Sequence, residues 1–167
     1  KYLNKSVNMK LVFIGATKFG LKCLKKCLDI EGLDLVGIVS SSKNFKISYS
    51  EKKIKNFLYA DFRKVALKNK IPLEFIKESM NDNSLINIVK KWRPDLFLVV
   101  GWYHILPKSW RDIAPAYGLH ASLLPNYAGG APLVWAIING EKKTGITLFK
   151  MGKDIDAGPI AGQKIEL

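Results

Sequence analysis

The stretch KLVFIGATKFGLKCLKKCLDI, residues 10–30, contains the pattern on which the fold prediction depends. It opens with a short apolar run that stops at Gly15, which is typical of a buried strand. The remainder places Leu21, Leu24 and Leu28 on one face of a helix, because residues three and four apart lie together on a helical surface. The stretch therefore predicts a first strand, a loop and a first helix.

The same alternation of strand and helix patterns continues along the chain and favours a parallel sheet. Continuous apolar runs such as DLFLVV at 95–100 suit strands that are covered on both faces. We expect an α/β, Rossmann-like fold with a mostly parallel, twisted sheet of about seven strands and helices on both faces. The expected strands are residues 10–14, 33–39, 71–76, 95–100, 117–120, 145–151 and 159–167, and the expected helices are residues 19–30, 54–69, 84–92 and 132–139.

Two local features complete this outline. The segment SSSKNFKISYSEKK, residues 40–53, is predicted to be a polar, lysine-rich loop, and Ser84 is a candidate cap for the helix that follows it. A chain of 167 residues is large enough for one core, so we expect a single domain over residues 9–167. Residues 1–8 precede a methionine and are predicted to be a native extension or an artificial addition.

The chain carries a formal net charge of +13, and its cations are mostly lysine, since Arg63, Arg93 and Arg111 are its only arginines. Nucleic-acid sites usually use arginine for bidentate contacts. The lysines are spread along the whole sequence, so a solvated basic surface is favoured over a dedicated site for a polyanion, which stays the alternative.

Cys23 and Cys27 are four residues apart in a helical pattern and are predicted to pack as small apolar side chains. Without a disulfide framework or a secretory signal, we expect a reducing cytoplasm. No apolar run reaches the roughly 18 residues that a membrane-spanning helix needs, so we expect no contact with a membrane.

His120 and Asp156 are the candidate catalytic pair. Histidine can exchange a proton near neutral pH, and a carboxylate can orient the ring or a water molecule. The residues are separated by one helix and one strand, which returns the chain to the same sheet edge, so we expect the two side chains to meet. Taken singly, His120 could be a structural histidine at a strand end, and Asp156 could serve a turn.

Other common sites are not indicated. The segment GATKFG lacks the G-x-G-x-x-G pattern, so a dinucleotide site is poorly supported, although a helix N-terminus there could accept an anion. We find no P-loop, no nucleophile elbow and no histidine and carboxylate cluster with metal-ligand spacing. We therefore expect no metal.

Three motifs, HASLLPNYAGGAP, INGEKKTGITLFKM and DIDAG, resemble the active-site segments of formyltransferases that use 10-formyltetrahydrofolate. MKLVFIGATKFG and KWRPDLFLVVGWYHILPKSW are similar to the first strand and to the fourth strand and following loop of that family. The resemblance covers nearly the whole chain. It implies the formyltransferase fold, with 10-formyltetrahydrofolate as the donor and residues 9–167 as the catalytic domain. Because such domains usually end later, a missing C-terminal piece stays an alternative.

In the family, an amine attacks the formyl carbon, helped by an Asn-x-His pair and a distant aspartate. The resemblance implies that His120 is a general base or stabilises the intermediate, and that Asp156 orients it or relays a proton. This chain has Gly118 where the pattern has asparagine. Loss of one oxyanion donor costs on the order of 2.7 to 4 kcal/mol, about a hundred- to a thousandfold in rate. His104 or Asn126 could substitute if the fold brings them near, and an impaired folate-binding homologue is the alternative.

The resemblance also implies a folate pocket made by the loop after the fourth strand, the SLLP segment and the loop before the catalytic aspartate. These contacts would be largely backbone groups and apolar walls, although the same residues could simply be packed loop corners. The residues that match this pocket are Tyr103, His104, Ile105, Leu106, Ser122, Leu123, Leu124, Pro125 and Asp154.

Two acceptors fit the motif APLVWAIINGEKKTGITLF, which resembles the methionyl-tRNA and sugar-nucleotide branches of the family. The tRNA enzymes normally carry a further C-terminal domain; we expect none from the residues of this sequence, which counts against methionyl-tRNA as the acceptor. Two features favour methionyl-tRNA: the basic charge of the chain and its lysine-rich segment 43–53. This segment lies where the tRNA enzymes have a loop that contacts the acceptor. We expect the amine of methionyl-tRNA as the acceptor, with an amino sugar nucleotide as the alternative.

Overall fold

The computed structural model describes residues 8–47, 50–77 and 79–166. Residues 1–7 of the predicted extension, and Leu167 at the end of the last expected strand, lie outside the described residues. The chain divides into two compact units, residues 1–114 and 115–167.

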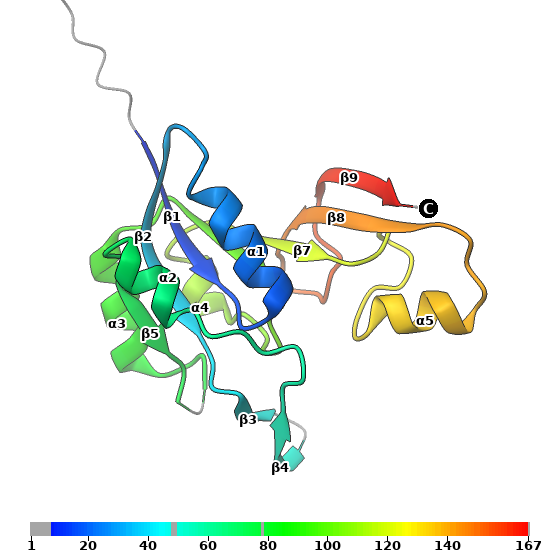
Figure 1. The fold of residues 1–167 in the computed structure, drawn as a ribbon, viewed down its shortest axis with the longest axis horizontal. Helices are drawn as coiled ribbons and strands as arrows, with labels where there is room; N and C mark the ends of the chain where they lie inside the picture. The colour runs from blue at the N-terminus through cyan, green and yellow to red at the C-terminus, as the bar shows by residue number, and fades with distance from the viewer. Residues whose placement is uncertain (1–7, 48–49, 78, 167) are drawn as a thin grey trace, which may run out of the picture. The chain divides into compact units, whose positions relative to one another are not determined.

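The first unit is built on a parallel sheet (Figure 1). Its strands are β1 (Met9–Ile14), β2 (Leu33–Ser40), β5 (Leu73–Phe75) and β6 (Leu96–Val100), in the order β5-β2-β1-β6. All three pairings between them are parallel. The four expected strands of this part of the chain are thereby confirmed, and so is their parallel direction.

The helices of the first unit follow from caps and apolar faces. Thr17 caps α1 by accepting a hydrogen bond from the amide of Gly20 at 3.1 Å. Asp82, and not the expected Ser84, caps the third helix, because its carboxylate accepts from the Ser84 amide at 2.8 Å. The helices are α1 (Lys18–Cys27), α2 (Arg63–Lys68), α3 (Asn83–Trp92) and α4 (Lys108–Arg111).

The prediction for residues 40–69 is wrong in two respects. The expected loop contains an antiparallel hairpin of β3 (Asn44–Ile47) and β4 (Ser50–Lys55). The expected helix at 54–69 shrinks to α2, because the chain turns at Asn56, whose side-chain oxygen accepts from the Leu58 amide at 3.0 Å. Such a side-chain turn competes with a helical start.

The second unit is antiparallel. Strands β7 (Ala116–His120), β8 (Thr144–Lys150) and β9 (Ile160–Glu166) pair in that order, and helix α5 (Pro132–Ile138) lies between β7 and β8 in sequence. The expected strands and helix are present within one or two residues. The period-2 burial of β8, with Gly145, Thr147 and Phe149 inside, shows that this strand has one covered face.

Candidate active site

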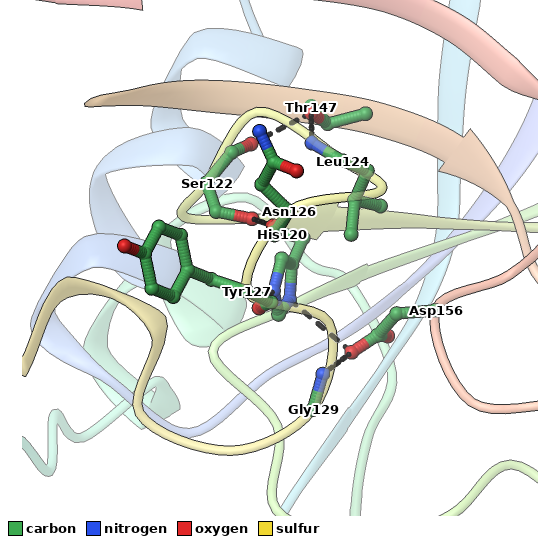
Figure 2. A network of polar contacts seen from close by, with 8 residues as sticks. All are labelled: His120, Ser122, Leu124, Asn126, Tyr127, Gly129, Thr147 and Asp156. Atoms are coloured by element: carbon green, nitrogen blue, oxygen red, sulfur yellow. Dashed lines mark hydrogen bonds and ion pairs between the residues drawn. The ribbon is translucent and has the colours of Figure 1, made fainter. Parts of the chain in front are cut away.

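His120 and Asp156 lie together in the second unit (Figure 2). His120 is the last residue of β7, and Asp156 belongs to the turn that joins β8 to β9. The distance from His120 Nδ1 to Asp156 Oδ2 is 3.4 Å, and the two side chains are 10% and 17% exposed. The fold therefore brings the predicted pair into contact in a place that is largely shielded from water.

The backbone around Asp156 fixes its carboxylate. Asp156 adopts a left-handed conformation with φ of 51°, which aspartate tolerates better than most residues. Its Oδ2 also accepts a hydrogen bond from the Gly129 amide at 2.9 Å. One carboxylate oxygen thus faces both the histidine ring and the loop that follows β7.

The second ring nitrogen of His120 is also occupied. Nε2 lies 2.8 Å from the backbone carbonyl oxygen of Tyr127. A carbonyl oxygen can only accept, so Nε2 carries a proton in this arrangement. Nδ1 then donates to Asp156 when the ring is doubly protonated, and it is a bare acceptor when the ring is neutral. Catalysis at either nitrogen requires one of these contacts to be exchanged for a substrate.

Thr147 holds the loop that carries the Tyr127 carbonyl. It is fully buried on β8, and its hydroxyl donates to the carbonyl of Ser122 at 2.7 Å and accepts from the amide of Leu124 at 3.1 Å (Figure 2). The side chain of Gln163 on β9 also donates to Thr147 Oγ1 at 2.9 Å. Sequence reasoning missed Thr147, although a threonine on the buried side of an alternating strand is a usable signal.

The space beside Gly118 is filled by apolar side chains. A Cβ placed on this buried glycine would lie 2.8 Å from Phe149 Cε1 and 3.4 Å from Met151 Cγ. Gly118 pairs directly with Phe149 across β7 and β8, so their side chains belong to the same face. The glycine is therefore required by the phenyl ring, and an asparagine side chain at 118 has no room while that ring stays in place.

The loop after β6 presents its predicted residues in different ways. The side chains of Tyr103 and Ile105 are exposed, whereas Leu106 is buried.

His104 is half-buried in the same loop, and its ring centroid lies 5.2 Å from that of Phe45. Burial lowers the pKa of its imidazole. His104 Nε2 and Trp102 Nε1 are buried without a hydrogen-bond partner among the described residues, so this loop holds polar atoms that a ligand or water can satisfy.

The predicted folate residues of the second unit are only partly accessible. Ser122 and Leu124 are buried, and the Ser122 hydroxyl donates to the Asn126 carbonyl at 2.7 Å.

The other predicted residues are more accessible. Leu123 covers Gly145, where an added Cβ would lie 2.5 Å from Leu123 Cδ2. Pro125 and Asp154 are exposed, as is Asn126, the proposed substitute donor. Their roles in binding a ligand stay predictions.

Neither a cluster of metal-ligating side chains nor a helix that could span a membrane occurs among the described residues. In residues 8–47, 50–77 and 79–166, no three histidine, cysteine or acidic side chains gather as a metal site would require. Within the same ranges, no helix has both the length and the apolar character needed to cross a membrane.

A family model described as formyl transferase matches residues 9–166. The chain belongs to this formyl transferase family. It is 39% identical over 153 residues to methionyl-tRNA formyltransferase of Clostridium acetobutylicum, covering 90% of this chain and 47% of the relative. It is 37% identical over 157 residues to methionyl-tRNA formyltransferase of Thermodesulfovibrio yellowstonii, covering 92% and 48%. The chain thus spans about half the length of the curated relatives that it matches.

Solved structures support the same fold. Glycinamide ribonucleotide transformylase 1 from Symbiobacterium toebii matches with a TM-score of 0.77 at 16% identity, over 99% of this chain and 76% of that one. Phosphoribosylglycinamide formyltransferase from Anaplasma phagocytophilum matches with a TM-score of 0.72 at 21% identity, over 95% and 72%. The predicted α/β, Rossmann-like formyltransferase fold is confirmed.

Proposed function

We propose that this protein transfers a formyl group from 10-formyltetrahydrofolate to the amine of methionyl-tRNA. The observation that carries the proposal is the shielded pair of His120 and Asp156, 3.4 Å apart, within a chain of the formyl transferase family. The names of the relatives at 39% and 37% identity support methionyl-tRNA as the acceptor. The free thiols of Cys23 and Cys27 support a reducing cytoplasm as the location.

In the proposed reaction, the amine nitrogen attacks the formyl carbon, and the bond from that carbon to the donor nitrogen breaks. The amine loses a proton and the released donor nitrogen gains one. The Tyr127 carbonyl marks where an oxygen acceptor sits against His120 Nε2, at 2.8 Å. When substrate displaces this carbonyl, the same N–H can stabilise the negative oxygen of the intermediate, and Asp156 holds the ring in place.

The loop after β6 fits the donor in character. It offers the aromatic ring of Tyr103, stacked on Phe45 at 5.3 Å between centroids, and the unpaired ring nitrogens of Trp102 and His104. A planar heterocycle with several donors and acceptors can use both kinds of group. We propose that this loop binds the folate donor.

Release of tetrahydrofolate in the presence of each acceptor tests the function. We expect turnover with methionyl-tRNA, and expect His120→Ala to abolish most of it while leaving folate binding in place. Turnover with an amino sugar nucleotide alone would assign the acceptor to the alternative class. No turnover with any amine would contradict the proposed function.

A second candidate function, a catalytically impaired folate-binding homologue, is favoured by Gly118 and Phe149. The ring of Phe149 lies where the amide of the family's asparagine would begin, so no side-chain donor is available at that position. This candidate predicts donor binding by equilibrium dialysis without formyl transfer. Measurable transfer that depends on His120 would exclude it.

A further inference from the structure

Helix α1 carries a continuous basic face. Its exposed lysines Lys18, Lys22, Lys25 and Lys26 fall within an arc of about 100° at 100° per residue. The opposite side of the helix contains its buried residues, and the helix has no acidic residue. Although lysines are spread along the whole sequence, those of α1 all lie on the exposed side of this helix, which is therefore positively charged.

These lysines are not neutralised by nearby carboxylates. Within the part of the chain that the structure describes, none of the four forms an ion pair. By contrast, Lys108 is paired with Asp112 at 2.7 Å and Lys164 with Glu166 at 2.9 Å. An unpaired row of ammonium groups is free to contact the phosphates of a polyanion.

Exposed aromatic rings adjoin the start of this helix. The Lys18 amide donates to the carbonyl of Leu58 at 2.7 Å, which joins α1 to the segment after β4. In that segment the ring of Phe57 is 80% exposed, and Lys55 Nζ lies 5.2 Å from its centroid. Phe19, the second residue of α1, is 44% exposed. An exposed ring beside cations is the arrangement on which unpaired bases stack.

We propose that the lysine face of α1, together with Phe57, binds single-stranded RNA. The lysines would contact successive phosphates, and Phe57 would stack on a base. The surface fits the unpaired end of a tRNA, so it names a contact for the acceptor of the proposed function and rests on that function for the choice of RNA. A membrane surface is less well matched, because the apolar side of α1 is already buried in its own unit.

Fluorescence anisotropy of a labelled single-stranded RNA hexamer, titrated with the full chain at several salt concentrations, tests the proposal. Each phosphate contact on a single strand contributes about 0.7 to the slope of log affinity against log salt. The variant K22Q/K25Q/K26Q removes three lysines, so it should reduce the size of this slope by about two. Phe57→Ala should leave the slope unchanged and weaken binding roughly 5- to 150-fold. The control K68Q/K90Q/K91Q removes the same charge from exposed lysines of α2 and α3 and should retain the wild-type slope.

Equal losses in the α1 and control variants would overturn the proposal, as would binding to phosphatidylserine vesicles with none to RNA. The titration contains no formyl donor, so its result is separate from the turnover assay. RNA binding with the expected slopes but no formyl transfer would leave the surface in place and remove the function. If the α1 variant turns over methionyl-tRNA as fast as the wild type, the proposed function stands and the proposed RNA surface is removed.

Discussion

Apolar burial is distributed very unequally between the two units. Among the described residues, the buried apolar side chains of the second unit are Ala116, Leu124, Ala136 and Phe149. Those of the first unit are more numerous and include four consecutive residues of β1, whose side chains alternate between the two faces of the sheet. Helix α1 buries Leu24 and Cys27, but α5 buries only Ala136 and leaves its remaining apolar side chains exposed. Those exposed residues are Leu133, Val134, Trp135, Ile137 and Ile138, at 47 to 77%.

Hydrogen bonds take the place of this packing in the second unit. Thr147 ties two strands to the loop after β7, and His120 and Asp156 each bond to the backbone of that loop. We infer that substitutions of buried residues in the first unit act mainly on stability, whereas those of buried residues in the second unit act mainly on the geometry of the candidate active site. The following variants test that contrast.

The largest expected effect is that of His120→Ala. Removing the ring should lower kcat/KM for formyl transfer by about 10²- to 10³-fold, because the Nε2–H that stabilises the negative oxygen of the intermediate is lost. Tetrahydrofolate release measures the rate. Asp156→Asn is the matched variant, since asparagine tolerates the left-handed backbone and can still accept a hydrogen bond from the Gly129 amide. It should lose less activity than His120→Ala. Full activity in both variants would remove this pair from the mechanism.

Phe13→Ala should cost about 3–5 kcal/mol of unfolding free energy, because its fully buried ring leaves a cavity in a packed sheet. Phe149→Ala, at a side chain that is equally inaccessible, should cost less, since its thinner surroundings can relax. Urea unfolding of both variants gives the comparison. A larger loss for Phe149→Ala would contradict the contrast between the units.

Thr147→Val keeps the shape of the side chain and removes its hydroxyl. The Leu124 amide then loses its acceptor in a buried place, so we expect a loss of about 1–3 kcal/mol in stability. The rate should fall further than the stability explains, with kcat affected more than KM, because the Tyr127 carbonyl is no longer held. Thr147→Ser, which keeps the hydroxyl, should restore most of kcat.

Gly118→Asn alone should destabilise the protein by roughly 1–3 kcal/mol, since the new Cβ meets the Phe149 ring. Combined with Phe149→Ala, the same asparagine should fit, and the two changes should be far from additive. Unfolding of the single and double variants completes the cycle. Activity of the double variant above that of Phe149→Ala would show that an amide at 118 still assists transfer; additivity would mean that the ring and residue 118 do not compete.

The smallest expected effect concerns Cys27. Burial raises the pKa of its thiol to about 11, above the unfolded value near 9. The folded state therefore keeps a proton that the unfolded state releases, and this part of the stability should decline as pH rises from about 9 to about 11. Urea unfolding at pH 8 and pH 10.5, compared with Cys27→Ala, isolates the contribution. An identical pH response in the variant would exclude it.

Sequence patterns predicted the elements whose faces are set by burial. The strand at Lys10–Ile14 and the helix after Thr17 follow from local apolar periodicity. His120 and Asp156 meet as predicted, but the predicted reason is wrong, because β8 runs antiparallel to β7 and ends opposite Tyr117; the turn after β8 brings Asp156 to His120. The hairpin at Asn44–Lys55 was not predictable in this way, because its strands are rich in lysine, the apolar alternation in β3 is limited to Phe45 and Ile47, and its end depends on the side chain of Asn56.

Within the site, the sequence predicted residue types but not their partners. Nothing in the sequence indicated that Thr147 would bond to the loop at Ser122, since that contact joins positions 25 residues apart. The glycine at position 118 was visible, but the ring that occupies the space beside it was not. The cross-strand register sets Phe149 opposite Gly118, and register depends on the whole sheet.

The group that meets His120 Nε2 belongs to the main chain of Tyr127. Every residue type supplies the same carbonyl, so mutation at 127 cannot delete this contact, and a library of side chains there would sample only its surroundings. The path of the loop can be changed, however, through the tether of the Tyr127 hydroxyl to Glu141 at 2.6 Å. Variation at Glu141, a surface position, is therefore a route by which activity can be tuned without altering any group that touches the substrate.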